Sequence, residues 1–256
     1  MKSKLIILNI LLLGVGINIA GVSAEELHVA VAANFIKPIK SIKSLFEKES
    51  GHHVIVSTGS TGQLYAQIKN GAPSEVFLAA DRKRPKQLIN EGLAVNGSLF
   101  TYAVGQLVLW SSQADRVDQT GQVLNHDKFK HLAIANPQTA PYGAAAKQVL
   151  EKRGLWESLQ NKIVQGNNIT QTYQLIATGN AELGFIALSQ YKAIVEKSSG
   201  SHWLVDQTLY DPIQQGAVLL KEGENQLAAQ AFIEFLQSPP ARRIIEEFGY
   251  VVPKEQ

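Results

Sequence analysis

The chain has 256 residues, of which 45% are hydrophobic and 18% are charged, with 20 Gly, 9 Pro and no Cys. This composition is typical of a globular protein and excludes a collagen, a disordered tail or a disulfide scaffold. The chain carries 24 Lys and Arg against 22 Asp and Glu, a formal net charge of +2, so no electrostatic footprint for nucleic acid is expected.

The N-terminal segment has the pattern of a secretory signal peptide. Lys2 and Lys4 precede residues 5–20, which contain only apolar residues, Gly and two Asn, and the small residues Val-Ser-Ala follow at 22–24. The alternative is an uncleaved membrane anchor, but the apolar run is shorter than the ~20 residues of a bilayer-spanning helix. We therefore predict a signal peptide over residues 1–24 that is removed by cleavage at its end.

The mature chain is expected to be a free periplasmic protein. Without Lys2 and Lys4 it has equal numbers of basic and acidic residues. No later stretch of sequence is long and apolar enough to cross a bilayer, and there is no Cys for a lipoprotein anchor. A chain of this length can bury a sufficient core without disulfides, and we expect two lobes of ~100 residues each.

Strands and helices alternate through the first part of the mature chain. Short runs of apolar, small and β-branched residues predict strands, at residues 27–33, 53–57 and 75–80. After each run, apolar residues recur at helical spacing, over residues 36–46 and from residues 64 and 88 onward. The apolar stretch at residues 100–110 has no helix after it, and we interpret it as a crossover to a second lobe.

The alternation then repeats beyond the crossover. We predict three more strands and two helices, the strands at residues 132–135, 163–165 and 183–188 and the helices at 143–153 and 170–178. Residues 214–221 resemble a return strand, and residues 226–247 resemble two helices broken at Pro239-Pro240.

This order of elements implies an α/β protein with two lobes and mostly parallel sheets. We assign residues 25–103 and 214–256 to lobe I, and residues 104–213 to lobe II.

Four junctions between a predicted strand and a helix are small, polar and uncharged. They are Ala33-Asn34, Ser60-Thr61-Gly62, Pro141-Tyr142-Gly143 and Asn167-Asn168-Ile169-Thr170. Ligands of open α/β sheets bind beyond the carboxyl ends of strands, where such loops lead into helices. We expect Asn34 to be the N-cap of the first helix, and Gly62 to allow close backbone approach to a ligand.

These junctions favour an anion as the ligand. Each helix N-terminus presents unpaired N–H donors and about half a unit of positive charge, so four of them would offer about two units to an oxyanion. Neutral donors also let a carrier release its cargo without breaking a buried ion pair. The alternative is that Ser, Thr and Asn merely cap their own helices, but four junctions spread over both lobes favour a shared cleft.

Two longer segments add a family resemblance, GAPSEVFLAAD at residues 71–81 and FGYVVP at residues 248–253. With the features above, they make the chain similar to the periplasmic molybdate-binding proteins of ATP-driven importers, over essentially the whole mature chain. The resemblance implies a type II periplasmic binding protein with a hinge of two crossing segments. It also implies a monomer without cofactor or enzymatic activity that delivers molybdate, and also tungstate, to the membrane permease subunit of an ABC transporter.

The resemblance places the oxyanion contacts on the four junctions. Asn34 would donate through its backbone amide and its side chain. Thr61 would donate through its N–H and O–H, with Ser60 as the alternative if the register differs by one. Tyr142 and Ile169 would donate only through their backbone N–H groups.

The chain departs from this family at two positions. Ala187 stands where some members have a Tyr whose hydroxyl touches the anion, and Ala33 stands where others have a Thr. Each change removes one donor, and a buried oxygen left unpaired costs ~1–3 kcal/mol unless Asn34 or a water replaces the contact.

Other ligands and activities remain as alternatives. Sulfate is smaller than molybdate and would have stretched hydrogen bonds in a cavity spaced for the larger ion. Protonated phosphate needs an acceptor in the site, for which Asp81 is the only nearby candidate in the sequence. A secreted hydrolase would need a titratable pair in the cleft. Residues 59–62 lack both the G-x-S-x-G pattern and the Lys of a phosphate loop.

The histidines and one basic stretch do not suggest a further site. His52-His53 lies at a strand entry and His126 and His131 flank a loop, without the spacing of metal ligands, so no bare metal ion is expected. We interpret Arg82-Lys83-Arg84 as a solvated helix start, with a surface that contacts the transporter as the alternative.

Overall fold

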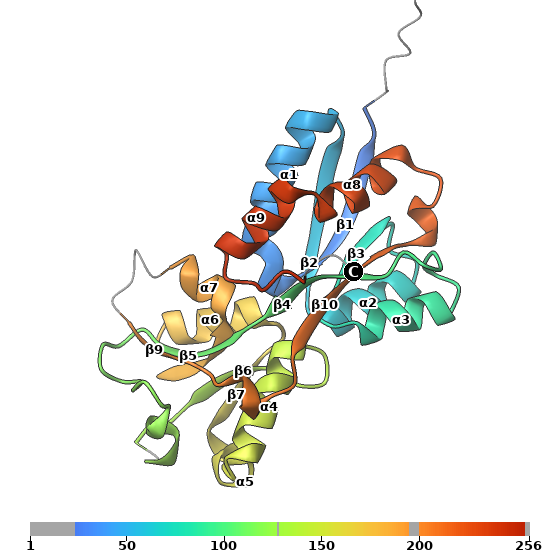
Figure 1. Cartoon of the computed structure of the whole chain (residues 1–256). Coiled ribbons are helices and arrows are strands. Elements are labelled where there is room, and N and C mark those ends of the chain that lie inside the picture. The colour runs from blue at the N-terminus through green and yellow to red at the C-terminus, as the bar shows by residue number, and fades with distance from the viewer. Residues whose placement is uncertain (1–23, 127, 195–199, 254–256) are drawn as a thin grey trace, which may run out of the picture.

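The computed structural model describes residues 24–126, 128–194 and 200–253, which form two lobes (Figure 1). The predicted signal peptide lies outside the described residues except for Ala24. No helix in the described ranges has the length and apolar character needed to cross a membrane.

The first lobe is built on a five-stranded sheet with the order β2-β1-β3-β10-β4. Its strands are β1 (Glu26–Ala32), β2 (His53–Gly59), β3 (Val76–Leu78), β4 (Phe100–Gly105) and β10 (Ile213–Leu219). β1 pairs in parallel with β2 and β3, whereas β10 is antiparallel to both β3 and β4. The central strands are almost fully buried because helices cover both faces of the sheet.

The second lobe repeats this arrangement, with the strand order β7-β6-β8-β5-β9. Its strands are β5 (Leu107–Ser111), β6 (Leu132–Ala135), β7 (Ile163–Gly166), β8 (Leu183–Ala187) and β9 (Ser201–Leu204). β6 is parallel to β7 and β8, and β5 is antiparallel to β8 and β9. In each sheet four strands therefore run in one direction and one strand, β10 or β5, runs against them, and the two-lobed α/β prediction is confirmed in this mixed form.

Helices surround each sheet. The helices of the first lobe are α1 (Ile36–Ser50), α2 (Thr61–Lys69), α3 (Lys83–Asn90), α8 (Leu227–Gln237) and α9 (Pro239–Glu247). Those of the second lobe are α4 (Pro141–Lys152), α5 (Trp156–Leu159), α6 (Ile169–Ala177) and α7 (Leu188–Lys192). The sequence did not predict α5, α7, β9 or the short 3-10 helix η1 (Ala33–Phe35), which have only three to five residues each.

The break between the last two helices lies where the sequence predicts it. Ser238 caps α9 by accepting a hydrogen bond from the Ala241 N–H, and Pro239 and Pro240 follow at the first two helical positions. Proline is well tolerated there because the N–H groups of a first turn have no intrahelical partner.

The predicted crossover at residues 100–110 consists of two strands that belong to different sheets. β4 ends at Gly105 and β5 begins at Leu107, so the chain leaves the first lobe at Gln106. β10 brings the chain back and pairs with β4, with a bulge between Gln215 and Gly216. β4–β5 and β10 are therefore the crossing segments between the lobes (Figure 1).

The lobes are packed against each other. The hydrophobic core of the second lobe includes Leu107, Ile134 and Phe185, and it extends to Ala32, Ala33 and Ala80 of the first lobe. The strand ends of the first lobe that lead into η1 and toward α3 are thus covered by the second lobe.

Candidate functional site

Three of the predicted site residues lie in the first turn of a helix. Thr61 is the first residue of α2, Tyr142 the second of α4 and Ile169 the first of α6. Backbone N–H groups at these positions have no partner inside their own helix. Elsewhere in the described part of the chain, no acceptor forms a hydrogen bond with these three N–H groups, so they are available to a ligand.

The caps of α2 and α6 leave these first N–H groups unused. The Ser60 side chain accepts from Gln63 N, and Gln63 Oε1 accepts from Ser60 N at 3.1 Å, which forms a capping box. Asn168 Oδ1 accepts from the N–H groups of Thr170 and Gln171, both at 3.0 Å. Both side chains satisfy donors further along the helix, so Ser60 and Asn168 cap their own helices and leave the first N–H groups of α2 and α6 free.

Thr61 offers a second donor besides its backbone. Its side chain is buried, and Oγ1 accepts a hydrogen bond of 2.9 Å from Ala80 N. Among the described residues the Thr61 hydroxyl donates no hydrogen bond, so its own hydrogen remains for a ligand. The Ser60 hydroxyl likewise accepts one backbone N–H and keeps its own hydrogen, so Ser60 remains the alternative hydroxyl donor beside Thr61.

The expectation that Asn34 caps the first helix is wrong. Asn34 lies inside η1, and α1 begins only at Ile36, with Phe35 at its N-cap position. The side chain turns into the protein instead, where Nδ2 donates to Gln215 Oε1 at 2.8 Å and to the Tyr250 hydroxyl at 3.0 Å. Both side-chain hydrogens are used by these bonds, which leaves the backbone N–H of Asn34 for a ligand.

Gln215 joins the first lobe to Tyr142 of the second. Its Oε1 accepts from Asn34 Nδ2 and, at 2.9 Å, from the Tyr102 hydroxyl, and its Nε2 donates to the Tyr142 hydroxyl at 3.2 Å. Burial raises the pKa of Tyr102 and Tyr142 well above the ordinary tyrosine value. These hydroxyls therefore stay neutral and place no negative charge beside the site.

The two lobes touch beside the four predicted residues. Gly62 N donates to Thr139 O at 2.8 Å, which brings the start of α2 to the loop before α4. The hydroxyl of Thr170 donates to Ala33 O at 3.3 Å, which brings the start of α6 to η1. A Cβ atom at residue 62 would lie 3.0 Å from Thr139 Cα. Gly62 therefore allows the close approach of the other lobe, whereas the sequence had assigned that approach to a ligand.

These contacts bring all four predicted residues to one place between the lobes. Thr61 and Tyr142 adjoin the first contact, Asn34 and Ile169 adjoin the second, and Gln215 connects Asn34 with Tyr142. The donors gathered there are backbone amides and one hydroxyl, and no titratable pair stands among these residues. Such a set of neutral donors can hold a fully deprotonated oxyanion, but it lacks the acid and base that a hydrolase needs.

A groove of about 370 Å³ lies beside these residues. Its wall includes Thr58 and Gln63 of the first lobe and Asn167, Thr170 and Gln174 of the second, and none of its lining residues is charged. The surface next to the site is thus uncharged and comes from both lobes.

A family model for bacterial extracellular solute-binding proteins matches residues 27–251. The chain belongs to this family. The match spans both lobes and both crossing segments, so the whole described fold is that of a solute-binding protein.

Two relatives named molybdate-binding protein ModA resemble this solute-binding protein over nearly its whole length. That of Azotobacter vinelandii is 54% identical over 238 residues, or 93% of this chain and 94% of the relative. That of Rhodobacter capsulatus is 52% identical over 229 residues, or 90% of this chain and 89% of the relative.

Solved structures of binding proteins are similar to this chain over both lobes. The periplasmic molybdate-binding protein of Azotobacter vinelandii has a TM-score of 0.86 and 44% identity, and the match covers 89% of this chain and 100% of that one. The sulfate-binding protein SubI of Mycobacterium tuberculosis has a TM-score of 0.73 at 11% identity, covers 88% of this chain and 86% of that one, and shows the fold alone.

The two positions where this solute-binding protein departs from some relatives are both buried. The backbone N–H of Ala187 donates to Gln190 Oε1 at 3.1 Å, so Ala187 presents neither a hydroxyl nor a free amide. The carbonyl oxygen of Ala33 accepts a hydrogen bond from the hydroxyl of Thr170 in the second lobe. The cost of the missing donors stays a prediction.

The sequence missed the residues that hold the predicted ones in place. Gln215, Tyr102, Tyr250 and Ser189 are buried and bonded to Asn34 or to each other. Tyr250 lies in the FGYVVP segment, which was noticed only as a family feature. Gln215 had one usable signal, since a polar residue in an otherwise apolar strand needs a buried partner.

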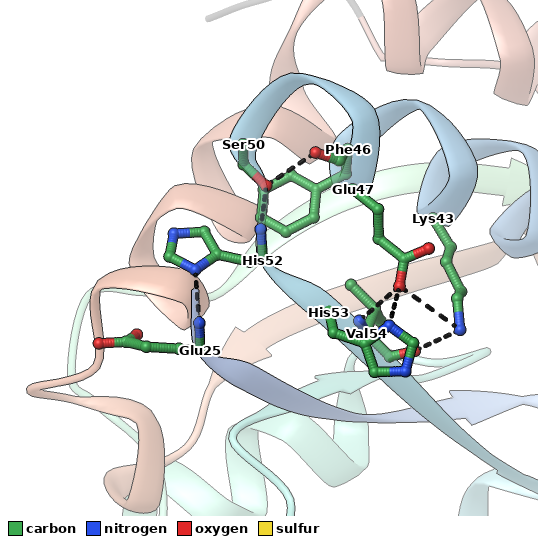
Figure 2. Close-up of polar contacts among 8 residues, drawn as sticks. All are labelled: Glu25, Lys43, Phe46, Glu47, Ser50, His52, His53 and Val54. Carbon is green, nitrogen blue, oxygen red and sulfur yellow. Dashed lines mark hydrogen bonds and ion pairs between the residues drawn. The ribbon is translucent and has the colours of Figure 1, made fainter. Parts of the chain in front are cut away.

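The histidine pair has a structural role in this solute-binding protein. Figure 2 shows His52 Nδ1 accepting from Glu25 N at 3.2 Å and His53 Nδ1 lying 2.8 Å from Glu47 Oε1. The same carboxylate accepts from Val54 N at 2.8 Å, which ties the end of α1 to β2. Among the described residues no group of three His, Asp or Glu is arranged to hold a metal ion.

The interpretation of the stretch from Arg82 to Arg84 as a solvated helix start is correct only for Lys83, which is exposed. Arg84 pairs with Asp81 at 2.7 Å and also donates to Gln138 O of the second lobe at 2.9 Å. Arg82 donates to the Thr101 hydroxyl. The side chains of Arg82 and Arg84 turn toward the protein because oxygen acceptors lie within their reach.

Proposed function

We propose that this protein captures molybdate, and also tungstate, between its lobes in the periplasm and delivers the anion to the permease subunit of an ABC importer. The observation that carries the proposal is the meeting of the helix starts at Thr61, Tyr142 and Ile169 with Asn34, without an acidic or basic side chain among them. The ligand named for the two ModA relatives supports molybdate as the anion. The protein would act as a monomeric carrier without a cofactor.

The charge of the anion follows from the donors. The N-termini of α2, α4 and α6 contribute about half a positive unit each when they point at one place, or about one and a half units in all, and the Asn34 N–H adds a further donor. A dianion balances this charge without Arg or Lys, and the backbone amides need no rearrangement because the fold already aims them. The hydroxyl of Thr61 adds a further neutral donor.

Sulfate and phosphate fit this donor set less well. Protonated phosphate requires an acceptor for its own hydrogen, and the sequence offered Asp81 for that role. Asp81 is bonded to Arg84 through both carboxylate oxygens, at 2.8 Å to the backbone N and 2.7 Å to Nη1, so it is committed elsewhere. Sulfate is smaller than molybdate and would leave longer, weaker hydrogen bonds in a site sized for the larger ion.

Binding would proceed by closure of the hinge. The anion first meets the donors of one lobe in an open form, the crossing strands bend near Ala103 and Gln214, and the second lobe then adds its amides. In this proposal residues 25–103 and 214–256 move as lobe I against residues 104–213. The bonds between Gly62 and Thr139 and between Thr170 and Ala33 form only in the closed state.

Thermal unfolding with each anion tests the proposal. A ligand at 100 times its dissociation constant stabilises the folded state by ~2.7 kcal/mol, so molybdate and tungstate should raise the melting temperature at concentrations where sulfate and phosphate do not. Equal shifts with sulfate and molybdate would contradict the proposed selectivity, and no shift with any of the four anions would contradict anion binding itself.

A further inference from the structure

A second cavity, of about 580 Å³, lies at the β4 edge of the first sheet, where Val251 pairs with Val104. Its lining comes from β4, from Arg82 just before α3, from the last residues of α8, and from Val252 and Pro253. None of the four residues proposed to contact molybdate lines it. Its volume is in the range of ~300–1,000 Å³ that is usual for small-molecule sites.

The cavity carries positive charge without a balancing carboxylate. Arg82 and Arg242 line it, and none of its lining residues is acidic. Arg82 donates to the Thr101 hydroxyl and Arg242 donates to Pro253 O at 2.6 Å, and both acceptors are neutral. Within the described ranges neither guanidinium forms an ion pair, in contrast to Arg84. Each guanidinium has five N–H donors, so most of them remain for a ligand.

The wall also has an apolar part. Leu99, Phe100, Val104, Leu236 and Val252 line the cavity, and the amides of Gln214 and Gln237 add neutral polar groups. An inorganic dianion would leave this apolar surface in contact with water. A ligand with an apolar body and an anionic end would cover it and meet the two guanidinium groups.

We propose that this cavity binds a small organic carboxylate with an aliphatic or aromatic body. A planar guanidinium pairs with a carboxylate through two parallel N–H···O bonds, and the two arginines provide such forks at one cavity. The apolar body lies against Phe100, Val104 and Val252. This site is separate from the proposed molybdate site, and either can exist without the other.

Calorimetric titration and thermal unfolding of the mature protein saturated with molybdate test the proposal. Benzoate and hexanoate are the probes, acetate is the control that lacks the apolar body, and benzyl alcohol is the control that lacks the carboxylate. Both probes should bind and raise the melting temperature, and both controls should do so much more weakly. Absence of binding by both probes at millimolar concentration, or equal binding of benzyl alcohol, would overturn the proposal.

Substitutions of Arg82 and Arg242 test whether hexanoate binds in this cavity. The double change R82Q with R242Q should weaken hexanoate binding by about tenfold or more, because charge-assisted hydrogen bonds are lost. R243Q is the matched control, since Arg243 is an exposed neighbour that does not line the cavity. Molybdate should stabilise all of these proteins alike. Unchanged hexanoate affinity in the double variant would overturn the proposal. A wild-type protein that did not bind molybdate would contradict only the proposed function and not the carboxylate site.

A second measurement needs no variant. Phenylglyoxal modifies accessible arginines, and mass spectrometry reports the extent of modification at each one. Hexanoate should protect Arg82 and Arg242 and leave Arg243 as reactive as before. Equal modification of all three with and without hexanoate would refute the assignment even if the double variant failed to fold.

Discussion

The hydroxyl of Ser189, in the second lobe, donates a hydrogen bond of 3.0 Å to the backbone carbonyl of Asn34, in the first. The Tyr250 hydroxyl lies 2.9 Å from both of these oxygens. All three residues are buried, so the bonds are protected from competing water. A lobe-to-lobe contact of this kind is lost when the hinge opens, and it should therefore contribute to ligand affinity through the closed state.

Ser189→Ala should weaken molybdate binding by about three- to tenfold, because one hydrogen bond contributes ~0.5–1.5 kcal/mol to the closed form. Isothermal titration measures this change. Ser158→Ala is the control, since the Ser158 hydroxyl bonds the Leu155 carbonyl within the second lobe. An affinity equal to that of the wild type would show that the Ser189 bond does not favour closure.

Gly62→Ala should hinder closure without unfolding either lobe. The added methyl would lie 3.0–3.1 Å from atoms of Thr139, and overpacking of this kind costs ~1–3 kcal/mol. We expect molybdate affinity to fall by about tenfold and the melting temperature of the ligand-free protein to stay nearly unchanged. Small-angle scattering should show compaction by molybdate in the wild type and less in the variant.

Gly59→Ala is the matched control for Gly62→Ala. A Cβ at residue 59 meets Leu64 of the same lobe at 3.4 Å or more, which is ordinary contact. This variant should close and bind as the wild type does. Equal affinities of the two variants would mean that the approach of Thr139 does not control closure.

Thr61 and Ser60 are expected to differ although they are neighbours. Thr61→Val keeps the shape but removes the hydroxyl, which costs ~1–3 kcal/mol of binding and also leaves Ala80 N without its acceptor. Ser60→Ala removes the cap of α2 and should lower the free energy of unfolding by ~1 kcal/mol with little change in affinity.

Titration calorimetry and chemical denaturation separate these effects of the Thr61 and Ser60 variants. The reverse pattern, with affinity lost at Ser60 and kept at Thr61, would move the hydroxyl contact by one residue. Thr61→Ser should retain most of the affinity, because it keeps the hydroxyl.

Stability should fall in alkali. Burial raises the pKa of Tyr102 and Tyr142 above the ordinary value of 10.0, so folding favours their neutral forms. The resulting stabilisation is complete below about pH 10 and is lost as the pH rises beyond it. Denaturation by guanidinium across this range should show the decline, and Tyr102→Phe should make it less steep. An equally steep decline in this variant would assign the effect to other groups.

Molybdate affinity, in contrast, should be constant from about pH 6 to pH 9, because the proposed donors are amides and neutral hydroxyls that do not titrate there. Calorimetry over this range measures it. A fall in affinity of tenfold or more between these limits would indicate an ionisable group at the anion that the proposed site does not contain.

The amino-acid sequence by itself determined the local elements of this protein. The periodicity of apolar residues predicted most strands and helices, the prolines at 239 and 240 predicted the start of α9, and the polar junctions marked the starts of α2 and α6. These features depend on contacts within a few residues along the chain, and such contacts can be recognised from spacing and residue type.

Only the tertiary structure decided what Asn34 and Gly62 do. Asn34 finds its side-chain partners 181 and 216 residues away, at Gln215 and Tyr250, and these bonds replace the helix cap that its position suggested. Gly62 faces Thr139 of the other lobe. Contacts between such distant residues exist only after both sheets have formed and the crossing strands have brought the lobes together, so no local pattern in the chain encodes them.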